Sequence, residues 1–427
     1  MIAIAAAVAA SAQSASATPQ PRSALYIEAG RLVDGVSDEA RLGQCIWVVD
    51  AVIFRVEDCG PTPAEAQRID WSRFTVLPGL IDLHTHLADV GQSADVAEPL
   101  KNSPAATALV GVRHARATLL AGFTSVRDVG TYRGLTDAAL RDAINRRDVP
   151  GRACGLRGAY LTIPGGGGEL NGVVKDNRDL PADMRLGVAA TPEEAAARTT
   201  ALIDSGVDFI KVIATGAVLA IGTEPGEPEL TPEQLRAIVT TAHARGKKVT
   251  AHAHGAIGIR NAILAGVDSI EHASLADEAA LELAKERGVA LVMDIYNGDY
   301  IDTYGREQGW PEEYLHKNRE TTDVQRAAFR RAVQLGVTIG YGTDAGVYPH
   351  GQNGRQFAYM VRHGMTPMQA IKSATSIAAA IIGVEAEVGS ITPGRYADLI
   401  AVTDDPLSDI SALESPIHVM KGGALVR

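Results

Sequence analysis

The chain has 427 residues, of which 46% are hydrophobic, and it carries a formal net charge of −11. It is long enough for a large buried core, and long for a single domain unless that domain is a barrel. The negative charge and the lack of a long basic run argue against a nucleic-acid partner. No apolar run reaches the roughly 18 residues of a membrane-spanning helix.

The first 22 residues resemble a secretory signal peptide. A short apolar stretch, Ile2–Ala10, is followed by small residues with an Ala-Ser-Ala-like cleavage pattern, although a positively charged segment does not precede it. We therefore expect a periplasmic or secreted protein, with a cytoplasmic location as the alternative. Residues 1–22 are left out of the fold prediction.

The next segment, residues 24–74, has the pattern of short strands separated by turns. Cys45 and Cys59 flank a predicted hairpin, CIWVVDAVIFRVEDC, with its turn near Asp50-Ala51. A disulfide between the two cysteines and a pair of free, buried thiols both fit this pattern. With Cys154 the chain has three cysteines, which form neither a disulfide framework nor a CxxC metal site.

Two histidines, His84 and His86, lie in the segment Leu80–Leu87. Residues i and i+2 of an extended strand project from the same face, so both rings can share one metal ion. Two solvated or core histidines on a strand are the alternative, which this pair alone does not exclude.

Six later segments share one pattern, in which a glycine ends a helical stretch and an apolar, β-branched run follows. They begin at Gly122, Gly206, Gly246, Gly266, Gly288 and Gly336. Glycine is the usual left-handed cap at a helix end, and such runs are typical of buried parallel strands. Helices are also predicted to begin with a Thr N-cap, Pro, and Glu or Gln at the third position, after Thr191, Thr231 and Thr366. With Leu80–Leu87 and Ala153–Thr162 the strands number eight, which predicts a (β/α)8 barrel of the α/β class.

The tail after residue 389 is again rich in short strand-like runs. Neither chain end is large enough to be a confident independent fold. We expect residues 23–78 and 390–427 to pair into one small β-domain beside a barrel that spans residues 79–389.

Several ionisable residues fall at matching positions near the strand ends, where barrel active sites form. Six residues after their glycines lie Asp128, His252, His272 and Asp294. Lys211 lies five residues after its glycine, and at about 3.3 Å per residue these positions have similar heights. The first strand ends in His84 and His86, and the last carries Asp344. This convergence predicts a metal site on one rim.

The same count assigns His252 as a metal ligand and places His254 beyond the strand end, on the substrate side; a loop histidine without a role is the alternative. Lys211 has apolar neighbours and should be buried, where the pKa of an amine falls. A neutral amine can react with carbon dioxide to give a carbamate that bridges two metals, and a lysine–carboxylate ion pair is the alternative. For Arg127-Asp128 we expect an ordinary ion pair between strand and helix; a supporting role behind the metal ligands is the alternative.

The motifs GLIDLHTH, FIKVIATG, VTAHAHG, SIEHAS and GYGTDAG, in this order, resemble the binuclear amidohydrolase superfamily. The similarity covers nearly all of residues 23–427 and includes VGSITPGRYADLIAV near the C-terminus. Within the superfamily the chain resembles the imidazolonepropionase-like and Xaa-Pro-dipeptidase-like branch, and most of all the bacterial amidohydrolases that cleave ochratoxin A into its isocoumarin acid and phenylalanine. Many relatives carry a Gly-Gly-His-Gly loop where TIPGGGGEL has Gly167, which suggests more room in this pocket.

The resemblance implies an amidohydrolase-type barrel with a composite β-sandwich, and two divalent metal ions, for which zinc suits the nitrogen-rich ligands. One ion would be held by His84, His86, carboxylated Lys211 and Asp344. The other would be held by Lys211, His252 and His272. Asp344 would act as base and then acid, and His254 would stabilise the oxyanion.

We therefore expect a hydrolase that releases a C-terminal amino acid from an N-acyl amino acid or dipeptide-like substrate. A Xaa-Pro dipeptidase and a cyclic-amide hydrolase are alternatives within the enzymes, and a non-catalytic metal scaffold is the alternative outside them. The long segment Tyr296–Glu320 holds five aromatic residues. It is either a lid or wall for an aromatic or apolar substrate, or a subunit contact or the packing of an extra helix. We expect a small-molecule substrate, no membrane partner, and a homo-oligomer.

Overall fold

The computed structural model describes residues 24–89, 94–146, 148–149 and 159–427. The signal-like segment and Cys154 lie outside these ranges. Within the described residues, no helix combines the length and the apolar character that crossing a membrane requires.

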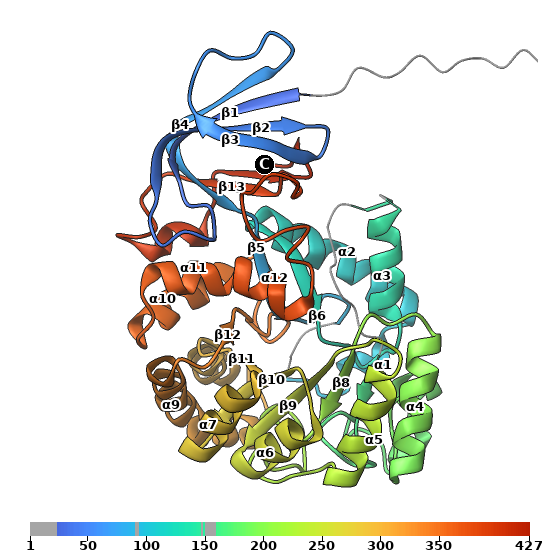
Figure 1. Ribbon diagram of the computed structural model, residues 1–427. Coiled ribbons are helices and arrows are strands. Elements are labelled where there is room, and N and C mark those ends of the chain that lie inside the picture. The colour runs from blue at the N-terminus through green and yellow to red at the C-terminus, as the bar shows by residue number, and fades with distance from the viewer. Residues whose placement is uncertain (1–23, 90–93, 147, 150–158) are drawn as a thin grey trace, which may run out of the picture.

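Both chain ends contribute strands to one sheet, at the top of the molecule in Figure 1. Its order is β15-β14-β13-β4-β1-β2-β3. The strands are β1 Ala24–Leu32, β2 Arg41–Val49, β3 Val52–Asp58, β4 Gln67–Pro78, β13 Leu399–Val402, β14 His418–Lys421 and β15 Ala424–Leu425. The long strand β4 pairs in parallel with β1 and antiparallel with β13, so it joins the N-terminal hairpin to the C-terminal strands. The predicted pairing of the two chain ends is confirmed.

Strands β2 and β3 form the hairpin predicted around Asp50-Ala51. Cys45 and Cys59 form a disulfide, with their Cα atoms 4.9 Å apart. The alternative of two free thiols is therefore wrong. The register explains the pairing, because Cys45 lies opposite Glu57, two residues before Cys59.

Eight further strands are parallel to their neighbours, and each lies in a segment where a strand was predicted. They are β5 Leu80–Thr85, β6 Phe123–Asp128, β7 Tyr160–Leu161, β8 Ile210–Ile213, β9 Val249–Gly255, β10 Ser269–Leu275, β11 Ala290–Val292 and β12 Ile339–Gly340. Six of them run in the order β12-β11-β10-β9-β8-β7, and β5 pairs with β6. Backbone hydrogen bonds join β5 to the chain after β12, from Leu83 N to Tyr341 O (2.8 Å) and from Asp344 N to His84 O (2.7 Å).

Helices follow most of these strands and cover their outer side (Figure 1). They are α1 Glu98–Lys101, α2 Pro104–Leu120, α3 Thr136–Asn145, α4 Pro192–Asp204, α5 Pro232–His243, α6 Ala256–Ala265, α7 Glu278–Arg287, α8 Asn297–Tyr300, α9 Glu312–Leu335, α10 Gln356–Arg362, α11 Pro367–Ser373 and α12 Ser376–Ile382. The three predicted N-caps are confirmed, because Thr191, Thr231 and Thr366 each accept a hydrogen bond from the backbone three residues on.

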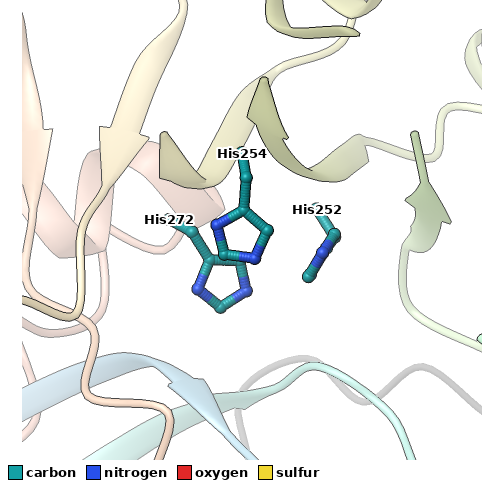
Figure 2. Close-up of side chains that lie close together, drawn as sticks. All are labelled: His252, His254 and His272. Atoms are coloured by element: carbon teal, nitrogen blue, oxygen red, sulfur yellow. The ribbon is translucent and has the colours of Figure 1, made fainter. Parts of the chain in front are cut away.

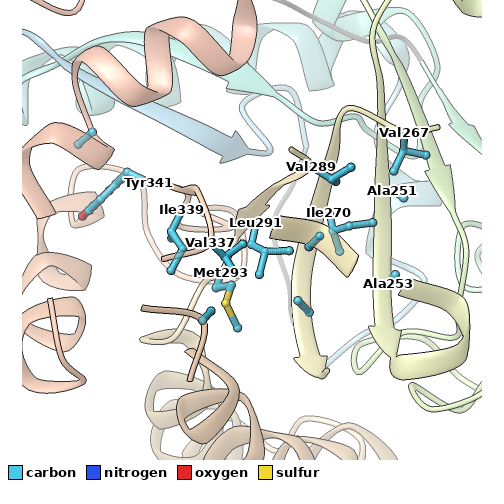
Figure 3. Close-up of a cluster of buried hydrophobic side chains, with 14 of the residues drawn as sticks. Ala251, Ala253, Val267, Ile270, Val289, Leu291, Met293, Val337, Ile339 and Tyr341 are labelled. Carbon is cyan, nitrogen blue, oxygen red and sulfur yellow. The ribbon is translucent and has the colours of Figure 1, made fainter. Parts of the chain in front are cut away.

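The apolar core lies between the strands and the helices. Figure 3 shows part of it, with Ala251 and Ala253 of β9 beside Ile270 of β10 and Leu291 of β11. Because side chains alternate along a strand, His252, which lies between those two alanines, faces the other side of β9. The core thus fixes which residues of the buried strands point into the interior.

The disulfide generates a prediction about the N-terminal sheet. Reduction removes a covalent closure of a loop of about 15 residues, which should lower the free energy of unfolding by about 3 kcal/mol. Denaturant unfolding with and without reductant measures this difference. Thiol titration of the unfolded, unreduced protein should find only one of the three cysteines reactive, whereas three reactive thiols would contradict the bond.

Candidate active site

One cavity at the C-terminal ends of the parallel strands brings together all the residues predicted for the site. It is lined by His84, His86, Lys211, His252, His254, His272 and Asp344, together with Asp294 and Gly167. The seven histidine, lysine and Asp344 side chains come from five of the eight strands (β5, β8, β9, β10 and β12) or from the chain just after them. Lys211 is only 2% exposed, as its apolar neighbours predicted.

His84, near the end of β5, is held by a buried carboxylate. Its Nδ1 donates to Glu271 Oε2 at 2.8 Å, and its Nε2 lies 3.5 Å from Asp344 Oδ1. Burial lowers the pKa of His84 well below its ordinary value, so the ring is neutral. A neutral imidazole fixed at Nδ1 presents an unprotonated Nε2, which is the form that binds a metal.

His86 is held in the same way by a backbone carbonyl. Its Nδ1 lies 2.7 Å from the oxygen of Gly130, which can only accept, and 3.2 Å from the hydroxyl of Tyr160. Its Nε2 lies 3.0 Å from Asp344 Oδ1. The two rings from β5 and Asp344 therefore meet at one point of the cavity.

Three more histidines converge from β9 and β10, as Figure 2 shows. The ring centroids of His252, His254 and His272 lie 4.6 to 4.7 Å from one another. Each offers a nitrogen within 4.8 Å of the others, and His272 also forms such a group with His84 and Asp344. By distance alone, His254 is as well placed as His252 to bind a metal.

The hydrogen bonds of the β9 histidines differ. His252 Nε2 lies 3.3 Å from the carbonyl oxygen of Gly216, to which it donates, and this leaves Nδ1 as the unprotonated nitrogen. His254 Nδ1 lies 2.8 Å from Ser274 Oγ. Burial lowers the pKa of both rings well below the ordinary value, so both are neutral.

The backbone at His272 departs from a regular strand. His272 has φ 70° and Ala273 has φ 49°, and the pairing of β10 with β9 shifts register just after them. Such non-glycine positions cost about 1–3 kcal/mol each and cluster at functional sites. The bulge allows His272 to enter the cavity although its neighbour Glu271 also faces inward. His272 Nδ1 then donates to Asp294 Oδ1 at 2.9 Å.

Asp344 also has a positive φ, 57°, and its loop lies close against β5. A Cβ at Gly342 would lie 2.2 Å from Val292 and 2.9 Å from the Cβ of His84, so the close approach requires glycine. Asp82 secures the contact, because it accepts hydrogen bonds from the backbone N and the hydroxyl of Thr343.

Two amide side chains, Asn297 and Gln325, donate hydrogen bonds to the carboxylates of Asp294 and Asp344. Asn297 Nδ2 donates to Asp294 Oδ2 at 2.8 Å and to Asp344 Oδ2 at 3.2 Å. Gln325 Nε2 donates to Asp294 Oδ1 at 3.1 Å. Asn297 therefore links Asp294, which orients His272, to Asp344.

The expected strand–helix ion pair of Arg127-Asp128 is wrong. Arg127 lies among the parallel strands, where Nη2 donates to Glu271 Oε1 at 2.5 Å and Nε to Leu83 O at 2.7 Å. Asp128 accepts backbone hydrogen bonds from Leu87 and Gly130 instead. Burial favours this exchange, because Glu271, wholly enclosed and charged, needs a cationic partner.

The walls of the cavity are apolar on one side and aromatic on the other. Leu219, Ile301 and Val347 belong to one apolar cluster, and Tyr132, in the chain after β6, and Tyr160, on β7, also line the cavity. The aromatic residues of the segment Tyr296–Glu320 do not line the cavity and pack mainly among themselves and with Tyr348, Tyr359 and the apolar cluster. Within the described residues, the packing alternative therefore holds for those aromatic side chains.

Gly167 lines the cavity beside Ala217. A Cβ at Gly167 would lie 3.2 Å from both the N and the Cβ of Ala217. The chain after β8 therefore packs closely against this glycine, and the expectation of a roomier pocket stays a prediction.

Three residues of the site escaped the sequence-based prediction: Glu271, Asn297 and Tyr160. Glu271 left a signal, because an acidic residue within a buried strand demands a partner. Asn297 and Tyr160 left none, since neither residue type is unusual after a strand.

Comparison with known proteins agrees with this geometry. The model of the amidohydrolase family matches residues 75–426. Ochratoxinase of Aspergillus niger is 31% identical over 423 residues, which cover 94% of this chain and 86% of that protein. Its crystal structure superposes with a TM-score of 0.81 at 30% identity, over 96% of each chain.

Two further relatives carry other names. One is the crystal structure of a Xaa-Pro dipeptidase with methionine bound in its active site. It is 36% identical with a TM-score of 0.89, and the superposition covers 95% of this chain and 100% of that one. Imidazolonepropionase of Symbiobacterium thermophilum is 26% identical over 90% of this chain and 87% of its own length. A family match over more than three quarters of the sequence, together with the ochratoxinase similarity, settles the predicted resemblance: the chain belongs to the amidohydrolase family.

Proposed function

We propose that this enzyme hydrolyses the carboxamide bond of an N-acyl amino acid or dipeptide-like substrate and releases the C-terminal amino acid, as in an ochratoxin A-type amide that yields phenylalanine. The observation that carries the proposal is the meeting of His84, His86, His272 and Asp344 in one cavity, where their ring nitrogens and carboxylate oxygen lie close enough together to hold a metal ion. The similarity to an ochratoxinase over 94% of the chain supports it.

The donor set fits two divalent metal ions, for which zinc suits the imidazole nitrogens. His84, His86, Lys211 and Asp344 would hold one ion, and Lys211, His252 and His272 the other. We propose that Lys211 bridges them as a carbamate, formed when its neutral amine adds carbon dioxide and loses a proton. When bound, the ions supply Lewis-acid polarisation of the substrate carbonyl and acidify a water molecule.

The proton transfers belong to Asp344 in this proposal. Its Oδ1 lies between His84 and His86, and its Oδ2 accepts from Asn297. Asp344 takes a proton from the attacking water and passes it to the leaving nitrogen, acting as base and then acid. His254, steadied at Nδ1 by Ser274, stabilises the oxyanion that develops on the substrate carbonyl.

A second candidate is hydrolysis of Xaa-Pro dipeptides, which the 36% identity to a Xaa-Pro dipeptidase favours. Cyclic-amide hydrolysis has weaker support, from the 26% identity to an imidazolonepropionase. An assay that offers each class of substrate separately to zinc-loaded protein distinguishes the three candidates by which class is cleaved. N-acyl amino acids and Xaa-Pro dipeptides each yield two products, whereas a cyclic amide yields one.

The proposal also covers the fold, the location and the oligomeric state of the enzyme. We propose that the eight parallel strands close as a (β/α)8 barrel over residues 79–389, beside a β-sandwich of residues 23–78 and 390–427. The Cys45–Cys59 disulfide supports a periplasmic or secreted location, because such bonds persist in oxidising compartments. We also propose a homo-oligomer.

The metal proposal predicts the composition of the purified protein. Elemental analysis of protein prepared without chelators should find about two divalent ions per chain, mainly zinc. Dialysis against a chelator should abolish activity, and added zinc should restore it. Full activity with less than one equivalent of metal would contradict the two-metal site.

Lys211→Ala should lose most of the metal and nearly all activity while remaining folded, because the variant lacks the bridging anion but keeps the barrel core. Added short-chain carboxylates can occupy the bridging position and should restore part of both. Lys211→Met is the matched control, since its side chain fills the space and should block this rescue. Two metals and normal turnover in Lys211→Ala would show that the lysine is a structural residue.

The different roles of the β9 and β10 histidines can be separated. His254→Ala should retain both metals and lose kcat by about 10²- to 10³-fold, the usual effect of removing an oxyanion donor. His272→Ala should lose one metal equivalent. Metal analysis of the two variants tests the assignment, and loss of metal from His254→Ala would make His254 a ligand.

A further inference from the structure

A buried lysine on helix α9, Lys317, takes no part in the proposed chemistry. Its side chain is 2% exposed, and its Nζ donates to the carbonyl oxygen of Ala220 at 2.8 Å and to Glu313 Oε1 at 2.5 Å. The same oxygen of Glu313 accepts the backbone N–H of Gly222 at 2.8 Å. Two side chains one turn apart on α9 therefore hold two backbone positions of a loop.

That loop, residues 216–223, follows β8 and is called the wall loop below. Its residues Ala217, Val218 and Leu219 line the active-site cavity. Leu219 packs against the apolar cluster that contains Ile301 and Val347. The wall loop thus presents apolar side chains to the substrate, while its next residues are tied to α9.

Burying Lys317 costs free energy of solvation, which apolar packing alone does not require. Burying an ammonium group loses hydration, which an apolar side chain of similar length would avoid. Lys317 recovers part of this by binding a carbonyl and a carboxylate. Although partial burial raises the pKa of Glu313, the hydrogen bonds from Lys317 and Gly222 hold it below the ordinary value. Glu313 is therefore charged, and the loop is held by charge-assisted hydrogen bonds.

We propose that Lys317 is a positioning residue that sets substrate specificity: with Glu313 it fixes the wall loop so that Val218 and Leu219 contact a bulky apolar group of the substrate. The cavity supports this assignment, because α9 also contributes Asn318 and Thr321 to its lining. One helix thus forms part of the cavity surface and anchors the loop beside it. The specificity claim rests on the proposed amide hydrolysis, whereas the anchoring does not.

The first experiment measures the anchor without any substrate. Hydrogen exchange of peptides covering residues 216–223 is compared in the wild type, Lys317→Met and Glu313→Gln. The matched control is Arg319→Met, which breaks the exposed Arg319–Glu312 pair (2.6 Å) on the same helix and does not contact the loop. Exchange in the wall loop should become about tenfold faster in the first two variants and stay unchanged in the control.

The second experiment uses four substrates in which an N-acetyl or N-naphthoyl group is joined to glycine or phenylalanine. In Lys317→Met the KM of the substrates with a bulky group should rise about tenfold, the effect of one lost methylene contact in an apolar pocket. The kcat values, the KM of N-acetylglycine and the metal content should remain within about twofold. Metal content is included because the loop begins at Gly216, whose carbonyl binds His252.

Unchanged exchange in Lys317→Met would overturn the anchor, and equal KM changes for small and bulky substrates would overturn the specificity role. A fall in kcat together with metal loss would make Lys317 a structural support of His252 instead. If the wild type cleaves none of the four substrates, the proposed function fails, and the exchange result alone decides whether Lys317 anchors the loop.

Discussion

A single buried carboxylate, Glu271, ties the inside of the parallel strands together. It receives hydrogen bonds from Arg127 on β6, Thr250 on β9 and the ring of His84 on β5, and it lies on β10 itself. An unpaired charge at this depth would be prohibitive, so these side chains must meet for the strands to pack. The hydrogen bond to Glu271 therefore also fixes the orientation of His84, and the Arg127–Glu271 ion pair sets the position of this ring in the cavity.

Most of the architecture was predictable because it depends on short-range rules. Thr231 and Thr366 carry their complete capping boxes, and Gly266, Gly288 and Gly336 end their helices in the left-handed conformation. Counting residues from such glycines gives the height of a side chain on its strand, because rise per residue is nearly constant. The convergence of the histidines followed from that count.

The remaining features depend on contacts between segments far apart in the sequence. The partner of Arg127 was predicted on a helix and lies on a strand 144 residues away. The close approach of Ala217 to Gly167 was not predicted either. Counting also separated His254 from His252 by height, whereas the two rings lie almost equally close to His272, because His272 pairs with Ala253, the residue between them. Long-range packing and backbone irregularities of this kind leave no local pattern.

The position of β4 affects how the chain is made. Its segment Thr75–Pro78 pairs with β13, which belongs to the last 30 residues of the sequence, and Gly79 N donates to Asp398 O at 2.8 Å. On the ribosome, all eight parallel strands are therefore translated before the open edge of β4 receives its partner. Until then an unpaired edge, directly continuous with the strand of His84, is exposed to other nascent chains. A truncated message that lacks the codons from β13 onward would release a product with all the site residues and an uncovered edge, which chaperones and proteases would recognise.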